Sequence, residues 1–133
     1  MGISKESAKK VPEGASQHVT AGPYSPVLEI TCSKLVVISG QTSTEPSGKV
    51  LGNDVPSQTR YTLENCKAQL ASAGCTLEDV FKTNVYMVDL DHWAEMNEVY
   101  REIMPSPHPV RTAVQTKLLP NLLIEIEMWA AKK

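Results

Sequence analysis

The sequence predicts an α/β fold in which two helices pack on one face of a sheet of about six strands. Two stretches near the end of the chain alternate with period two, which is the pattern of strands. Strands and helices interleave in the order ββ-α-β-α-ββ, and two helices are most simply placed on one face of a sheet. A length of 133 residues fits one domain.

Composition and charge exclude several classes of protein. With a net charge of −2, the chain lacks the strongly basic balance of a dedicated nucleic-acid binder. No apolar run approaches the ~18 residues of a membrane span, and the polar N-terminus predicts neither a signal peptide nor an anchor. We therefore expect a cytoplasmic protein. The spacing of its histidines and cysteines predicts no metal site, and the odd number of cysteines, three, fits poorly with a disulfide framework.

The first part of the chain divides into a leader and two strands. Residues 1–16 are polar and predict a flexible leader, and residues 17–133 form the domain. Val27–Thr31 and Lys34–Ser39 are expected to be strands joined by a short polar turn, with one more short strand near His18–Thr20. The segment Lys34–Ser39 is apolar on both faces, so both of its faces need cover.

The middle of the chain is expected to form a loop, a helix and a strand. The loop spans Gly40–Pro56, and the helix runs from Ser57 to about Ala73, with Gly74 as its C-cap. The strand Val80–Val88 follows.

A second helix is expected to end before a proline-rich segment. Asp89 or Asp91 can cap its start, and it runs to about Met104. Three prolines between positions 105 and 109 then end the helix and lead into the next strand.

The last two strands place an arginine and a glutamate on faces that we expect to point away from the core. In the first strand Arg111 shares a face with Ala113, opposite the face of Val110, Thr112 and Val114. In the second strand Glu125 lies opposite the apolar face of Leu122, Ile124, Ile126 and Met128. A guanidinium can bind a carboxylate, and a carboxylate can position water.

A second copy of the chain is the simplest cover for the open face of the sheet. Two helices cover one face, whereas Lys34–Ser39 presents apolar residues to both. The sequence therefore predicts self-association.

Six short motifs, in order and at suitable spacing from about Thr20 to Ala131, resemble the RidA/YjgF family of reactive-intermediate deaminases, also labelled the endoribonuclease L-PSP family. They are Gly22-Pro23-Tyr24-Ser25, Val37-Ile38-Ser39-Gly40-Gln41, Lys82-Thr83-Asn84-Val85-Tyr86-Met87-Val88-Asp89-Leu90, Asn97-Glu98-Val99-Tyr100, Pro109-Val110-Arg111 and Ile124-Glu125-Ile126-Glu127.

The resemblance implies a chorismate-mutase-like fold with a mixed sheet and a homotrimer with clefts between subunits. It also implies a hydrolase that converts enamines and imines, such as 2-aminoacrylate and 2-iminobutanoate, to 2-oxo acids and ammonia. No metal or organic cofactor is implied, and the partner is a small imine or enamine carboxylate.

The resemblance assigns the catalytic roles to Arg111 and Glu125. Arg111 would bind the substrate carboxylate, and Glu125 would hold or activate the attacking water. A structural ion pair of Arg111 with Glu125 or Glu127 is the alternative, and Glu127 is the natural control for Glu125.

Six further residues are implied to bind the substrate: Tyr24, Ser39, Gly40, Trp93, Asn97 and Ala113. The family tyrosine lines the cleft from the neighbouring subunit, and Ala113 would act through its main-chain carbonyl. Trp93 stands where relatives carry Phe, and ordinary core packing is its alternative role.

Strand geometry alone does not bring Arg111 and Glu125 together. A tight hairpin near Pro120 would pair Gln115 with Glu125 and leave Arg111 four residues away, about 13 Å. Either the strands are not neighbours, or a subunit interface or a strand crossing joins the groups. Other functions therefore stay open: a deaminase of a larger enamine, or a non-catalytic, carboxylate-binding or chaperone-like trimer. RNA cleavage has less support.

Overall fold

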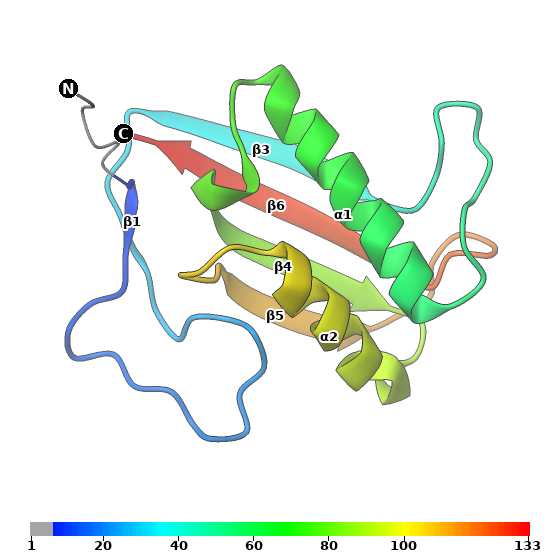
Figure 1. Ribbon diagram of the computed structural model, residues 1–133, viewed down its shortest axis with the longest axis horizontal. Coiled ribbons are helices and arrows are strands. Elements are labelled where there is room, and N and C mark those ends of the chain that lie inside the picture. Colours follow the sequence, from blue (N-terminus) through cyan, green and yellow to red (C-terminus); the bar gives the residue numbers. More distant parts are fainter. Residues whose placement is uncertain (1–6) are drawn as a thin grey trace.

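Four strands form a mixed sheet in the order β3-β6-β4-β5, and the computed structural model describes residues 7–133. Strands β3 (Lys34–Gln41) and β4 (Val80–Met87) both pair antiparallel with β6 (Ile124–Lys132). Strand β5 (Val110–Gln115) pairs parallel with β4 at one edge. Helices α1 (Val55–Ser72) and α2 (Trp93–Ile103) cover one face of the sheet (Figure 1). The predicted mixed sheet with two helices on one face is confirmed.

Two short strands form a second, separate sheet. Strand β1 (Lys9–Lys10) pairs antiparallel with β2 (Glu29–Ile30), so the six strands are divided four and two. The predicted hairpin of β2 with β3 is wrong, because the backbone of Thr31 bonds to Ala8 instead.

The N-terminal segment differs from the prediction in two places. Strand β1 lies inside the predicted leader, whose residues 1–6 fall outside the described part of the chain. The strand expected near His18–Thr20 is wrong, because the amide of Ala21 donates to the carbonyl of His18 and closes a turn there.

Helix α1 begins two residues earlier than the sequence predicts. Asp54 is its N-cap and accepts a hydrogen bond from the amide of Ser57 at 2.8 Å, and Pro56 lies in the first turn. Gly74 follows the last turn with a φ of +76°, a conformation that glycine adopts without strain. The predicted end of this helix is confirmed.

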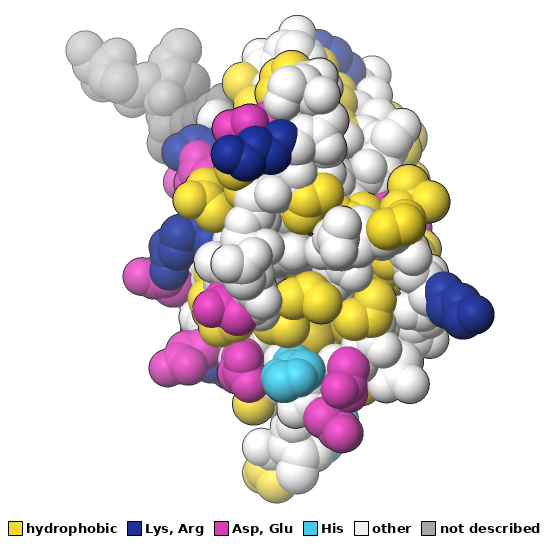
Figure 2. All heavy atoms as spheres, turned by 90° about the vertical axis from the view of Figure 1, so that its right-hand side faces the viewer, with side chains coloured by type: hydrophobic (Ala, Val, Ile, Leu, Met, Phe, Trp, Pro, Cys, Tyr) yellow, Lys and Arg dark blue, Asp and Glu magenta, His cyan; other side chains and the backbone are white. Residues whose placement is uncertain are grey.

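Two short 3-10 helices, η1 (Leu77–Asp79) and η2 (Leu90–His92), precede β4 and α2. Asp89 caps η2 rather than α2. His92 lies 3.8 Å from a carboxylate oxygen of Asp89 and 3.0 Å from one of Glu95. Figure 2 shows a face of the molecule on which acidic side chains flank a histidine. Within residues 7–133, no helix is long and apolar enough to cross a membrane.

The core lies between the helices and the sheet, and the other sheet face is open in the single chain. Ile126 and Met128 of β6 are fully buried against the helices. On the open face, Leu35 and Val37 of β3 are 60% and 58% exposed. The apolar second face of this strand therefore stands uncovered in one copy.

Candidate active site

Arg111 lies on the helix-covered face of the sheet, which corrects the expectation that it points away from the core. Its register partner in β4 is Thr83, which is buried under α2. The guanidinium reaches α2, where its Nη1 lies 4.0 Å from the sulfur of Met96. Val110 and Thr112 lie on the open face of the sheet instead. The prediction that they face the core is therefore wrong.

The guanidinium of Arg111 lies among three aromatic rings. Its Cζ is 4.9 Å from the ring centre of Tyr100, 5.1 Å from that of Tyr24 and 5.9 Å from that of Trp93. Nη2 is inaccessible to solvent and has no hydrogen-bond partner among residues 7–133. Burial lowers the pKa of Arg111 from its ordinary value. The cation is thus held by aromatic faces, while part of its hydrogen-bonding capacity stays free.

No carboxylate within residues 7–133 forms an ion pair with Arg111. The alternative of a structural ion pair with Glu125 or Glu127 is therefore wrong for the single chain. Glu127 instead accepts hydrogen bonds from Asn84 at 3.0 Å and from the hydroxyl of Tyr86 at 2.5 Å. These bonds, that of Tyr86 first, lower the pKa of Glu127.

Gly22 brings a backbone segment close to Arg111, Asn97 and Trp93. A Cβ at position 22 would lie 3.0 Å from Nη2 of Arg111, 3.1 Å from Nδ2 of Asn97 and 3.1 Å from Cζ2 of Trp93. The Oδ1 atom of Asn97 is also buried, with no hydrogen-bond partner in the described part of the chain. An unpaired cationic donor and an unpaired acceptor thus occupy one small volume.

Tyr24 is held over Arg111 of its own chain, whereas the resemblance implied a tyrosine supplied from the neighbouring subunit. The side chain of Gln17 donates to the carbonyl of Tyr24 at 3.0 Å. Ser25 is fixed on the other side, since its hydroxyl donates to the carbonyl of His108 and its amide to that of Pro109. Two anchors therefore fix the tyrosine backbone.

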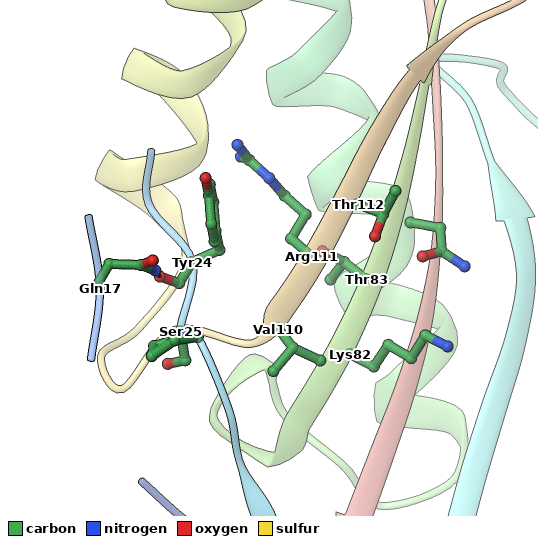
Figure 3. Close-up of a pocket in the computed structure, with 10 residues that line it drawn as sticks. Gln17, Tyr24, Ser25, Lys82, Thr83, Val110, Arg111 and Thr112 are labelled. Atoms are coloured by element: carbon green, nitrogen blue, oxygen red, sulfur yellow. Dashed lines mark hydrogen bonds between the residues drawn. The ribbon is translucent and has the colours of Figure 1, made fainter. Parts of the chain in front are cut away.

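A pocket of about 360 Å³ lies beside this cluster, lined by residues of β4, β5 and the segment that carries Tyr24. Figure 3 shows Arg111 and Tyr24 side by side on one side of β5, with Thr112 and Lys82 pointing to the other side. Ala113 lies two residues further along β5 on the same face as Arg111.

Glu125 lies on the opposite, open face of the sheet, beside Gly40. Its register partner is Tyr86 of β4, and a Cβ at Gly40 would overlap its Oε2 atom. Ser39 is exposed next to Gly40, where the pairing of β3 with β6 changes register between Ile38 and Gln41. A hollow of about 530 Å³ is lined by Glu125, Tyr86 and residues 116–119.

The structure therefore separates the predicted site residues into two groups. The arginine group contains Arg111, Tyr24, Trp93, Asn97 and Ala113, and the glutamate group contains Glu125, Ser39 and Gly40. Strand β4 lies between β5 and β6, so the two strands are not hairpin neighbours.

Sequence reasoning missed four members of the arginine group: Gly22, Thr83, Met96 and Tyr100. Gly22, Thr83 and Tyr100 fall within the quoted motifs, which was the available signal. Met96 carries no such signal.

Comparisons with known proteins agree with this fold. The Endoribonuclease L-PSP family model matches residues 15–132. A RutC family protein of Pyrococcus horikoshii is 42% identical over 114 residues, which cover 84% of this chain and 89% of that protein. The Escherichia coli protein named "Putative reactive intermediate deaminase TdcF" is 34% identical over 128 residues, covering 93% and 98%. The crystal structure of YyfB from Yersinia pestis, of the conserved Rid family, has a TM-score of 0.72 at 30% identity, covering 93% and 98%. The chain belongs to the Endoribonuclease L-PSP family, which is the RidA/YjgF family.

Proposed function

We propose that this chain hydrolyses small enamines and imines that carry a carboxylate, such as 2-aminoacrylate and 2-iminobutanoate, to 2-oxo acids and ammonia. The observation that carries the proposal is the half-buried side chain of Arg111, whose buried Nη2 has no hydrogen-bond partner and which has no ion-pair partner within residues 7–133. A buried charged donor without a partner is costly, and a substrate carboxylate would supply that partner.

The reaction needs one water and no redox partner. Water adds its oxygen to the imine carbon, the C=N electron pair moves to nitrogen, and the resulting carbinolamine expels ammonia as the C=O bond forms. Glu125 passes both protons of the attacking water to the nitrogen in turn, the first as the carbinolamine forms and the second, from the carbinolamine hydroxyl, as ammonia leaves. An enamine substrate first becomes the imine, as its nitrogen loses a proton and its β-carbon gains one. Asn97 offers its unpaired Oδ1, and Ala113 its main-chain carbonyl, to the N–H groups of the substrate.

A second copy of the chain completes the site. Arg111 and Glu125 lie on opposite sheet faces of one chain, so one substrate can meet both only where two copies adjoin. We infer a homotrimer in which the Ser39, Gly40 and Glu125 group of one copy faces the Arg111 group of the next. The exposed Leu35 and Val37 support burial of the open face in such an assembly.

A carboxylate-binding trimer without catalysis is the second candidate. The separation of Glu125 from Arg111 in the single chain favours it, because binding needs only the arginine group. A deaminase of a larger enamine is the third, and the pocket of about 360 Å³ that Tyr24 and Thr112 help to line gives it room.

The test measures release of 2-oxobutanoate from freshly generated 2-iminobutanoate. We expect acceleration by the wild type, and its loss in Arg111→Ala and Glu125→Gln at the same oligomeric state. Arg60→Ala is the matched control, since Arg60 forms only an exposed ion pair with Glu102 on the outer surface. Binding of 2-oxobutanoate without turnover would instead favour the non-catalytic trimer.

A further inference from the structure

Tyr100 is the closest aromatic ring to the Arg111 guanidinium, and neither the reaction nor the pocket lining uses it. Its ring centre lies 4.9 Å from the Cζ of Arg111, and its side chain is fully buried. It closes the Asn97-Glu98-Val99-Tyr100 motif on α2, one turn after Met96. The ring therefore lies beneath the cation rather than in the path of a ligand.

The hydroxyl of Tyr100 is anchored on the strand next to Arg111. It forms a hydrogen bond with the hydroxyl of Thr83 at 2.9 Å, and Thr83 is the register partner of Arg111 across the parallel β4–β5 pair. Both residues are completely buried. The ring is thus fixed relative to the backbone that carries the guanidinium, and burial raises the pKa of Tyr100 to about 12, so the ring stays neutral.

A ring face holds a guanidinium without using its N–H groups. The N–H donors of a guanidinium lie in its plane, and a carboxylate partner would occupy them. An aromatic ring instead attracts the guanidinium from above or below that plane. With no ion pair to a carboxylate within residues 7–133, the guanidinium depends on its rings for orientation. The fork then stays available for a carboxylate from outside the chain.

We propose that Tyr100, fixed by Thr83, is the positioning residue of Arg111 and sets the strength of carboxylate binding at the proposed site. The inference rests on the proposed function, in which Arg111 binds the carboxylate of the ligand. Tyr100 itself does not contact the ligand.

The decisive experiment changes the electronics of the ring while keeping its shape. Binding of 2-oxobutanoate is measured by titration calorimetry for the wild type, for Tyr100→Phe, and for a variant with trifluorinated phenylalanine at position 100. Fluorination withdraws electrons from the ring face and leaves the packing nearly unchanged. We expect the affinity of Tyr100→Phe for 2-oxobutanoate to lie within about threefold of that of the wild type. The fluorinated variant should bind 2-oxobutanoate about five- to thirtyfold more weakly than Tyr100→Phe.

Two further variants separate positioning from stability. Thr83→Val removes the same hydrogen bond as Tyr100→Phe, so we expect the double variant to bind no more weakly than either single one. Leu70→Ala removes a fully buried side chain of α1 and is the matched control, destabilised but with unchanged affinity.

The outcomes are distinguishable. Equal affinity of the Phe and trifluorinated variants would overturn the role of Tyr100 while the proposed function stands. The same would follow if Leu70→Ala weakened binding as much as fluorination does. Failure of the wild type to bind any small carboxylate would instead overturn the proposed function.

Discussion

Gly40 determines where the Glu125 carboxylate can lie. Gly40 lies near the end of strand β3, where the pairing with β6 changes register, and its backbone passes so close to Glu125 that any side chain at position 40 would occupy the space of the Oε2 atom of Glu125. A Cβ at position 40 would meet only the far end of the Glu125 side chain, which can rotate away and remove the clash. Gly40 thus matters for the position of the Glu125 carboxylate more than for stability.

We expect Gly40→Ala to lower kcat for 2-iminobutanoate about a hundredfold or more, because the displaced carboxylate no longer reaches the water. The melting temperature should change little, since Glu125 can rotate away. Gly14→Ala is the control, because a Cβ at Gly14 meets no atom within 4 Å. Unchanged kcat in Gly40→Ala would argue against the role of Glu125.

The sequence predicts which face of a strand packs against the helices better for some strands than for others. In β6, Ile124, Ile126 and Met128 alternate with Glu125 and Glu127, and the faces were predicted correctly. In β5 the more apolar face, with Val110, Thr112 and Val114, is the open one, so the pattern predicted the wrong face for the helices. The rings around Arg111 come from α2 and from Tyr24, distant in sequence, and no local pattern reports them.

Strand β1 is attached to the main sheet through one buried lysine. Lys9 donates from Nζ to the carbonyl of Val80 at 2.7 Å and to that of Pro107 at 2.9 Å. Burial lowers the pKa of Lys9 from 10.5 to about 8, although the charge of Asp79 opposes this. A neutral amine still has two N–H groups for the two carbonyls.

Between about pH 8 and pH 10.5 the unfolded chain therefore binds more protons at Lys9 than the folded chain does. The contribution of Lys9 to the free energy of unfolding should rise with pH across this range. We expect the melting temperature of the wild type, relative to Lys9→Met, to increase from pH 7.5 to pH 10. Lys10→Met, on the exposed side of the same strand, is the control. The same pH dependence in both variants would contradict the expectation.

Across the whole molecule, the sequence predicted that the sheet needs a second cover, and the structure shows why one chain cannot provide it. Both helices lie on the same face, and Leu35 and Val37 remain exposed on the other. The division of the predicted site could not be read from the sequence, because it depends on the pairing register. Arg111 pairs with Thr83 and Glu125 with Tyr86, and these two positions of β4 point to opposite faces of the sheet.

A site shared between copies predicts complementation. Arg111→Ala and Glu125→Gln should each be inactive, but trimers refolded from an equal mixture should regain activity in about a quarter of their clefts. The control mixes Arg111→Ala with the double variant Arg111→Ala/Glu125→Gln, which has no intact arginine. Mixed trimers without recovered activity would show that the two groups do not share a substrate.

The parallel pairing of β4 with β5 has a consequence for how this protein can diverge. A parallel pair needs a crossover, and here the crossover is α2, so one continuous segment from Val80 to Gln115 carries Thr83, Trp93, Asn97, Tyr100 and Arg111. Glu125 and Gly40 belong to other parts of the chain. Gly22 and Tyr24 are the members of the arginine group that lie outside this segment. Under the proposed function, substitutions that change anion binding would therefore concentrate in one stretch of the chain, and those that change water activation would fall elsewhere.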